Sequence, residues 1–117
     1  MSRDPLRELA LAEQRGDWAE VAAIAEHDLM DLRKATLAWQ HALEHDPTDL
    51  PAHHELARLY RVERNWSALA DLLEHQLQLV GNPEARRAVL ADLIAIQRDE
   101  LGDVARANQL QRLLDEQ

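Results

Sequence analysis

Apolar residues in this sequence recur at spacings of three and four, and short turn-forming segments interrupt them at regular intervals. Such spacing places the apolar side chains on one face of an α-helix. The clearest interruptions are Gly16-Asp17, Asp46-Pro47 and Gly81-Asn82-Pro83, because Gly favours helix ends and Pro cannot continue a helix. The pattern predicts seven helices, joined by connections of about two to five residues.

The composition supports an all-α chain and argues against several functions. Leu and Ala supply most of the apolar content, whereas there is no Phe, one Tyr and no Cys. The absence of Cys excludes disulfides and thiolate metal sites. The net charge of −9 argues against nucleic acid, whose binding depends on Lys and Arg. The apolar stretches are too short for a membrane span, and the first residues lack the apolar region of a signal peptide. We therefore expect a cytoplasmic protein without membrane or nucleic-acid partners.

A two-part motif recurs along the chain, and its best copy begins His53-x2-Leu56-Ala57-x2-Tyr60. Degenerate copies flank it: Ala19-x2-Ala22-Ala23-x2-Glu26 and Ala91-x2-Ile94-Ala95-x2-Arg98. The second halves read Ala35-x3-Trp39 with Pro47, Leu69-x3-Leu73 with Gly81, and Ala107-x3-Gln111. This pattern resembles the tetratricopeptide repeat, whose signature is W-x2-L-G-x2-Y, then A-x3-F, then P, over about 34 residues.

The resemblance implies an all-α, right-handed α-solenoid of about three antiparallel helix pairs plus one N-terminal helix. Residues 1–117 would form a single domain. Its parts would be a capping helix at 1–15 and helix pairs at 16–49, 50–83 and 84–117. In such arrays each pair leaves an apolar face that only its neighbour can cover.

The resemblance also implies a binding surface. In tetratricopeptide proteins, the first helix of each pair lines a concave groove that holds an extended peptide or a partner helix. The corresponding positions here are Glu20, Ile24 and His27, then His54, Arg58 and Arg61, then Val89, Asp92, Ile96 and Asp99. The centre is basic, and an Arg can hold a carboxylate through two hydrogen bonds. Yet the family's carboxylate clamp uses Lys and Asn, so a mixed-charge segment or a partner helix fits these residues better.

The segment from His41 to His45 spells H-x-x-E-H, the inverzincin metal motif, with Glu44 as the base. On a helix the two histidines lie one turn apart and could share a metal ion. A catalytic zinc needs a third protein ligand, and nothing in the sequence supplies one convincingly. His41 and His45 are therefore weak candidates for adventitious metal binding. No nucleophile or phosphate loop is evident either, and we expect neither an enzyme nor a cofactor.

Two functional interpretations remain open. The first is a non-catalytic scaffold that binds a protein or peptide in the groove. The second is a structural module that self-associates through its C-terminal helix, where Leu110, Leu113 and Leu114 lie, or a designed or excised repeat without a natural ligand. Solenoids normally need a polar outer face on the terminal unit, and three leucines fit that requirement poorly.

Overall fold

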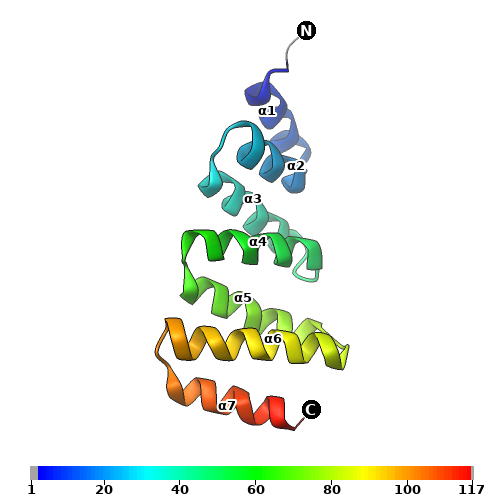
Figure 1. Cartoon of the computed structure of the whole chain (residues 1–117). Helices are drawn as coiled ribbons and strands as arrows, with labels where there is room; N and C mark the ends of the chain where they lie inside the picture. The colour runs from blue at the N-terminus through cyan, green and yellow to red at the C-terminus, as the bar shows by residue number, and fades with distance from the viewer. Residues whose placement is uncertain (1–2, 117) are drawn as a thin grey trace. The chain divides into compact units, whose positions relative to one another are not determined.

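The computed structural model describes residues 3–116, and its helices lie in the segments that the apolar spacing predicts (Figure 1). The elements are α1 (Pro5–Arg15), α2 (Trp18–Ala23), η1 (Ile24–Asp28), α3 (Leu32–His45), α4 (Leu50–Glu63), α5 (Trp66–Leu79), α6 (Pro83–Ala95), η2 (Ile96–Glu100) and α7 (Val104–Asp115). The η elements are π-helical turns that directly continue α2 and α6. None of residues 3–116 lies in a strand, which confirms the predicted all-α chain with seven helices for this part of the sequence. None of these helices is long and apolar enough to cross a membrane.

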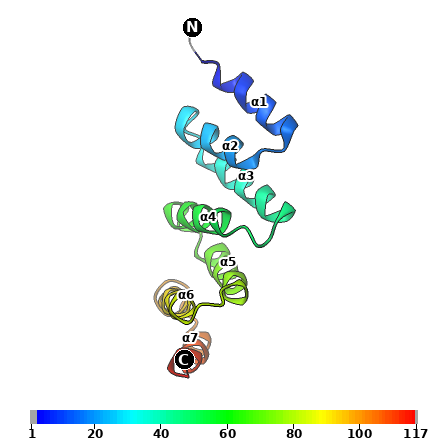
Figure 2. The ribbon, with the colours of Figure 1, turned by 90° about the vertical axis from the view of Figure 1, so that its right-hand side faces the viewer.

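The chain divides into two compact units within α4: one ends at Leu59 and the other begins at Tyr60. In the first unit, α2 packs along α3, and α1 packs against α2 and η1. In the second unit, α6 packs against both α5 and α7, and Figure 2 shows α6 and α7 side by side. The predicted arrangement of three helix pairs in one domain stays a prediction.

The core of the first unit consists mainly of alanines and aliphatic residues. Leu59, from α4, is fully buried among residues of α1, α2, η1 and α3. Trp18 and Trp39 are partly buried and pack against this cluster. The small side chains allow the helices to approach each other closely. The sequence contains no Phe, so the tryptophans supply the large aromatic surfaces that pack against this core.

His53 occupies the position of the signature Trp and has no exposed surface. Its Nε2 lies 2.9 Å from the carbonyl oxygen of Pro47. A carbonyl can only accept, so the ring donates from Nε2, which fixes its tautomer. This contact holds the start of α4 to the connection that precedes it.

Four helix ends share one turn, in which a residue with positive φ precedes an Asp or Asn. The positive-φ residues are Gly16 (69°), Met30 (54°), Arg64 (56°) and Gly102 (69°). The next side chain accepts a backbone N–H of the following helix in each case, and these caps are Asp17, Asp31, Asn65 and Asp103. An Asp or Asn cap satisfies a donor that the first helical turn leaves unpaired. A glycine marks two of these turns in the sequence, at Gly16 and Gly102. Met30 and Arg64 are not turn-forming residues, so only the Asp or Asn that follows marks the other two turns.

The backbone hydrogen bond that closes each of these turns spans five residues in two of them and six residues in the other two. At the end of α1, Asp17 N–H bonds the carbonyl of Ala12, five residues earlier, and Asn65 bonds Tyr60 in the same way at the end of α4. At the ends of η1 and η2 the bonded residues are six apart: Asp31 with Ala25, and Asp103 with Gln97. The π-helical turns therefore accommodate one additional residue in the first and third copies of the motif.

The additional residue shifts which side chains face the core. In the middle copy, Leu56 and Tyr60 are buried, and the carbonyl of Tyr60 closes the turn. The equivalent residues, counted back from the other two closing bonds, are Val21 with Ala25 and Leu93 with Gln97, all buried. The motif copies read from the sequence instead pair Ala22 with Glu26 and Ile94 with Arg98 at these positions. That register is one residue away from the one that the closing bonds define.

Candidate functional site

The ten predicted groove residues divide into exposed and buried sets. His27, His54, Arg58, Arg61 and Asp99 are exposed, and Glu20 and Asp92 are partly exposed. Ile24, Val89 and Ile96 are buried, with exposed fractions of 4%, 8% and 3%. These three residues belong to the core, which corrects their assignment to the binding surface. The physical reason for Ile24 and Ile96 is the one-residue register shift at η1 and η2.

When positions are counted back from the backbone hydrogen bonds that close the turns, the predicted surface positions of the first and third copies move by one residue toward the N-terminus. In the first copy they become Ala19, Ala23 and Glu26 in place of Glu20, Ile24 and His27. In the third copy they become Ala91, Ala95 and Arg98. Each of these six residues is at least partly exposed. The accessible face of α2 and the accessible face of α6 are thus each formed largely by alanines. The charged residues predicted from the sequence lie beside these alanines.

Arg58 does not present a free guanidinium. It donates to both carboxylate oxygens of Glu26, at 2.6 and 2.9 Å, and to Glu55 at 2.8 Å. The pair with Glu26 links α4 to η1 within the first unit. The hydrogen bond from Arg58 holds the pKa of the Glu26 carboxyl below its ordinary value, against a smaller opposing effect of desolvation. The basic centre expected from the sequence is therefore neutralised at Arg58 by carboxylates of the same chain.

Arg61 lies in the second unit and forms an ion pair with Asp92 of α6. Both side chains also line a hollow of about 140 Å³, together with Trp66, Ala95, Ile96, Asp99 and Glu100. Three of the predicted groove residues, Arg61, Asp92 and Asp99, thus lie around one concavity, and the buried Ile96 forms part of its floor. Trp66 and Glu100 were not predicted to belong to this site, and neither residue type at its position carries a sequence signal for it.

A second hollow, of about 270 Å³, lies in the first unit between α1, α2 and α3. Trp18 and His41 form part of its wall and stack on each other, with ring centroids 4.5 Å apart and planes inclined by 21°. Lys34 and Glu13 form an ion pair at 3.4 Å across the same hollow. The sequence pattern does not predict the contact between His41 and Trp18, which requires the fold to bring α2 and α3 together.

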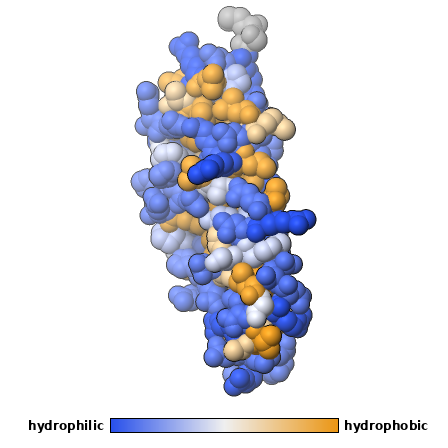
Figure 3. Space-filling model, turned by 90° about the vertical axis from the view of Figure 1, so that its left-hand side faces the viewer, coloured by the Kyte–Doolittle hydropathy of each residue, from blue (hydrophilic) through white to orange (hydrophobic). Residues whose placement is uncertain are grey.

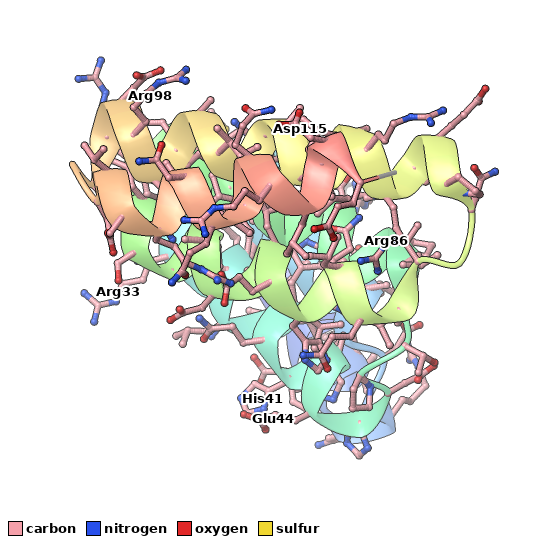
Figure 4. The ribbon with its side chains drawn as sticks, turned by 90° about the horizontal axis from the view of Figure 1, so that it is seen from below. Arg33, His41, Glu44, Arg86, Arg98 and Asp115 are labelled. Carbon is pink, nitrogen blue, oxygen red and sulfur yellow. The ribbon has the colours of Figure 1, made fainter. Side chains whose placement is uncertain are left out.

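The H-x-x-E-H segment is accessible but is not assembled with further ligands. His41 Nδ1 lies 3.4 Å from the Glu44 carboxylate, and Figure 4 shows the two side chains next to each other. His45 lines a separate shallow hollow beside Trp39 and Asp46. Within residues 3–116, no group of three or more His, Asp or Glu side chains is arranged to hold a metal ion.

The surface shown in Figure 3 is mostly hydrophilic, with apolar side chains in small separate groups. At the C-terminal end, Leu110 is fully buried, Leu114 is partly exposed and Leu113 is 39% exposed. Two of the three leucines that the sequence singled out therefore contribute to packing within the second unit. Leu113 alone presents a large part of its side chain to solvent.

Comparison with protein-family models, with curated proteins and with solved structures gave no match to this chain.

Proposed function

We propose that this chain is a tetratricopeptide-like scaffold, a solenoid of helix pairs that binds a segment of another protein and catalyses no reaction. The observation that carries the proposal is the convergence of Arg61, Asp92 and Asp99 on one hollow. These three residues come from two copies of the motif, and the resemblance to the tetratricopeptide repeat implies that all three belong to one binding surface.

The corrected register supports the same proposal. Ala91 and Ala95 lie on the accessible side of α6, and their small side chains leave the backbone of a bound segment room to approach the helix. Charged side chains beside them supply hydrogen-bonding groups for orientation. Contacts with the small apolar side chains contribute affinity for the bound segment, and charge-assisted hydrogen bonds from the polar flanks fix its orientation.

The proposal is tested by quantitative affinity capture with the full chain and two charge-reversal variants. Asp99→Arg changes the rim of the hollow, whereas Asp71→Arg places the same change on an exposed position of α5 that does not line it. We expect a partner whose recovery falls at least tenfold with Asp99→Arg and stays unchanged with Asp71→Arg, since truncating or reversing one interfacial charge typically costs more than about 1.4 kcal/mol. Equal recovery of every captured protein by both variants and the parent chain contradicts the groove assignment.

Self-association through α7 is the second candidate, and the exposed side chain of Leu113 favours it. In that case Leu113→Glu converts an oligomer into a monomer. Sedimentation of the parent chain as a monomer across a hundredfold range of concentration rules this candidate out.

A further inference from the structure

The hollow in the second unit combines an apolar floor with a negatively charged rim. Ala95 and Ile96, at the junction of α6 and η2, contribute apolar atoms, and Trp66 contributes an aromatic ring from the start of α5. Asp92, Asp99 and Glu100 contribute three carboxylates. A site with this construction can accommodate a side chain that has an apolar stem and a polar end.

The charges at the rim favour a cation. Among the described residues that line the hollow, Arg61 contributes the one guanidinium, and Asp92 already neutralises it. Arg98 lies beside the hollow and its Nε donates to Asp99 at 3.1 Å, and Figure 4 shows its side chain extending away from the helix surface. Two guanidinium groups thus face three carboxylates, and the remaining negative charge belongs to Glu100, which makes no ion pair among the residues that the structure describes. An anionic side chain would meet this excess negative charge, whereas a cation would be attracted by it.

The size of the hollow restricts the ligand further. Pockets for small molecules usually measure about 300–1,000 Å³, so a hollow of about 140 Å³ is too small for one of them and corresponds to a single side chain. An indole ring in the wall adds a favourable interaction with a cation placed over its face. The net charge of the whole chain, −9, also draws basic partners toward it at low ionic strength.

We propose that this hollow holds the side chain of an Arg or Lys from a basic segment of the partner protein. The proposal deepens the proposed function and rests on it. The stem of the bound side chain packs on Ile96 and Ala95, and its cationic end lies among Trp66, Asp99 and Glu100. The ion pair between Arg61 and Asp92 fixes one wall and prevents Arg61 from repelling the incoming cation.

The test is an NMR titration of the isotopically labelled full chain with N-acetyl-arginine amide. N-acetyl-citrulline amide is the uncharged control of similar shape, and N-acetyl-glutamate amide is the anionic control. We expect the arginine probe to shift the Trp66 indole N–H and the backbone amides of Asp99 and Glu100 in a saturable manner. The indole signals of Trp18 and Trp39, which belong to the first unit, serve as internal references and stay in place.

Matched variants locate the bound cation. Asp99→Asn combined with Glu100→Gln is expected to weaken binding of the arginine probe about tenfold, since the two substitutions remove both exposed charges that attract the cation. Asp71→Asn combined with Glu116→Gln removes the same charge elsewhere in the second unit and is expected to leave the affinity unchanged. Equal weakening by both double variants, stronger binding of the glutamate probe, or no movement of the Trp66 signal overturns the proposal.

The outcome separates this inference from the proposed function. If a partner is lost from the Asp99→Arg variant while the arginine probe leaves Trp66 unmoved, the groove binds a partner but not through a cation in this hollow. If the probe binds saturably and no captured protein responds to Asp99→Arg, the hollow recognises cations and the scaffold proposal fails.

Discussion

The guanidinium of Arg58 donates to both carboxylate oxygens of Glu26, at 2.6 and 2.9 Å, although the two residues lie 32 positions apart in the sequence. The bond joins α4 to the π-helical turn η1, and Glu55 completes the coordination of the guanidinium from one turn earlier on α4. Two parallel hydrogen bonds of this kind fix the orientation of the guanidinium relative to the carboxylate, in addition to pairing their charges. Arg58 therefore positions two elements of the first unit relative to each other.

This pair makes the stability of the first unit dependent on pH in the acidic range. The pKa of Glu26 is lowered in the folded chain from its ordinary value of 4.5, so the pair contributes fully above that value. Its contribution is lost as the pH falls through the lower pKa of the folded state. We expect Glu26→Gln to reduce the free energy of unfolding by up to about 1 kcal/mol at pH 7 and to flatten its decline below pH 4.5, as measured by urea unfolding at several pH values. An unchanged pH profile in this variant contradicts the assignment.

The register correction predicts the effect of truncating Ile24 and Ile96. Because both are buried, Ile24→Ala and Ile96→Ala are each expected to lower the free energy of unfolding by about 2–4 kcal/mol. His27→Ala and Asp99→Ala, at exposed positions that the sequence assigned to the same surface, are expected to change it by less than about 0.5 kcal/mol. Denaturant unfolding distinguishes the two sets, and small effects for both isoleucines would restore the original register.

The backbone conformation predicts opposite effects on stability when alanine replaces each of two glycines. Space for a Cβ is open at both Gly81 and Gly102, but only Gly102 has a positive φ, of 69°. Gly102→Ala is expected to destabilise the chain by about 1 kcal/mol, because an L-residue is strained in that conformation. Gly81→Ala is expected to be neutral or stabilising by up to about 1 kcal/mol, since it restricts the unfolded chain. A comparison of the two melting temperatures measures the backbone effect alone.

Met30 allows the converse substitution. It adopts a φ of 54° and is 81% exposed, so its side chain contributes little packing. Met30→Gly relieves strain of about 1–2 kcal/mol and adds about 1 kcal/mol of entropy to the unfolded chain, for a net stabilisation of about 0.5 kcal/mol. Met30→Leu serves as the matched control and is expected to leave thermal unfolding unchanged. A lower melting temperature for the glycine variant would show that the side chain makes a contribution beyond its exposed contacts.

The contact between His53 and Pro47 gives a further prediction. His53→Leu removes the hydrogen bond to the Pro47 carbonyl and leaves that acceptor without its buried partner. We expect a loss of about 1–3 kcal/mol in the free energy of unfolding. His54→Leu, at the neighbouring exposed position, is expected to be close to neutral, and equal effects of the two substitutions would contradict a specific role for His53.

Most of the helical structure follows from local sequence signals. The apolar spacing and the Gly, Pro, Asp and Asn residues at the connections were enough to place all seven helices, because helix ends depend on nearby residues. The extra residue in η1 and η2 was not predictable in this way. Met30-Asp31 gives no conspicuous turn signal, and the insertion becomes visible only in the backbone hydrogen bonds of Asp31 and Asp103.

The candidate site was predictable only in part, for a different physical reason. The repeat pattern placed Arg61, Asp92 and Asp99 on the accessible side of their helices, and these residues do line one hollow. It gave no information on which charges pair. The neutralisation of Arg58 by Glu26, and the position of Trp66 beside Glu100, depend on packing between helices that are distant in sequence. Side-chain partners across such distances are determined by tertiary structure, not by local periodicity.

The π-helical turns also set a rule for engineering this chain. A set of ligand-contacting residues transplanted from a regular 34-residue repeat, by aligning Leu56 with Ala22 or with Ile94, would place side chains such as those at 24 and 96 inside the protein. Such a graft would unfold the protein before the designed surface could bind its target. Grafts onto these two helices must instead be numbered backward from the capping residues Asp31 and Asp103, with one position skipped at the widened turn.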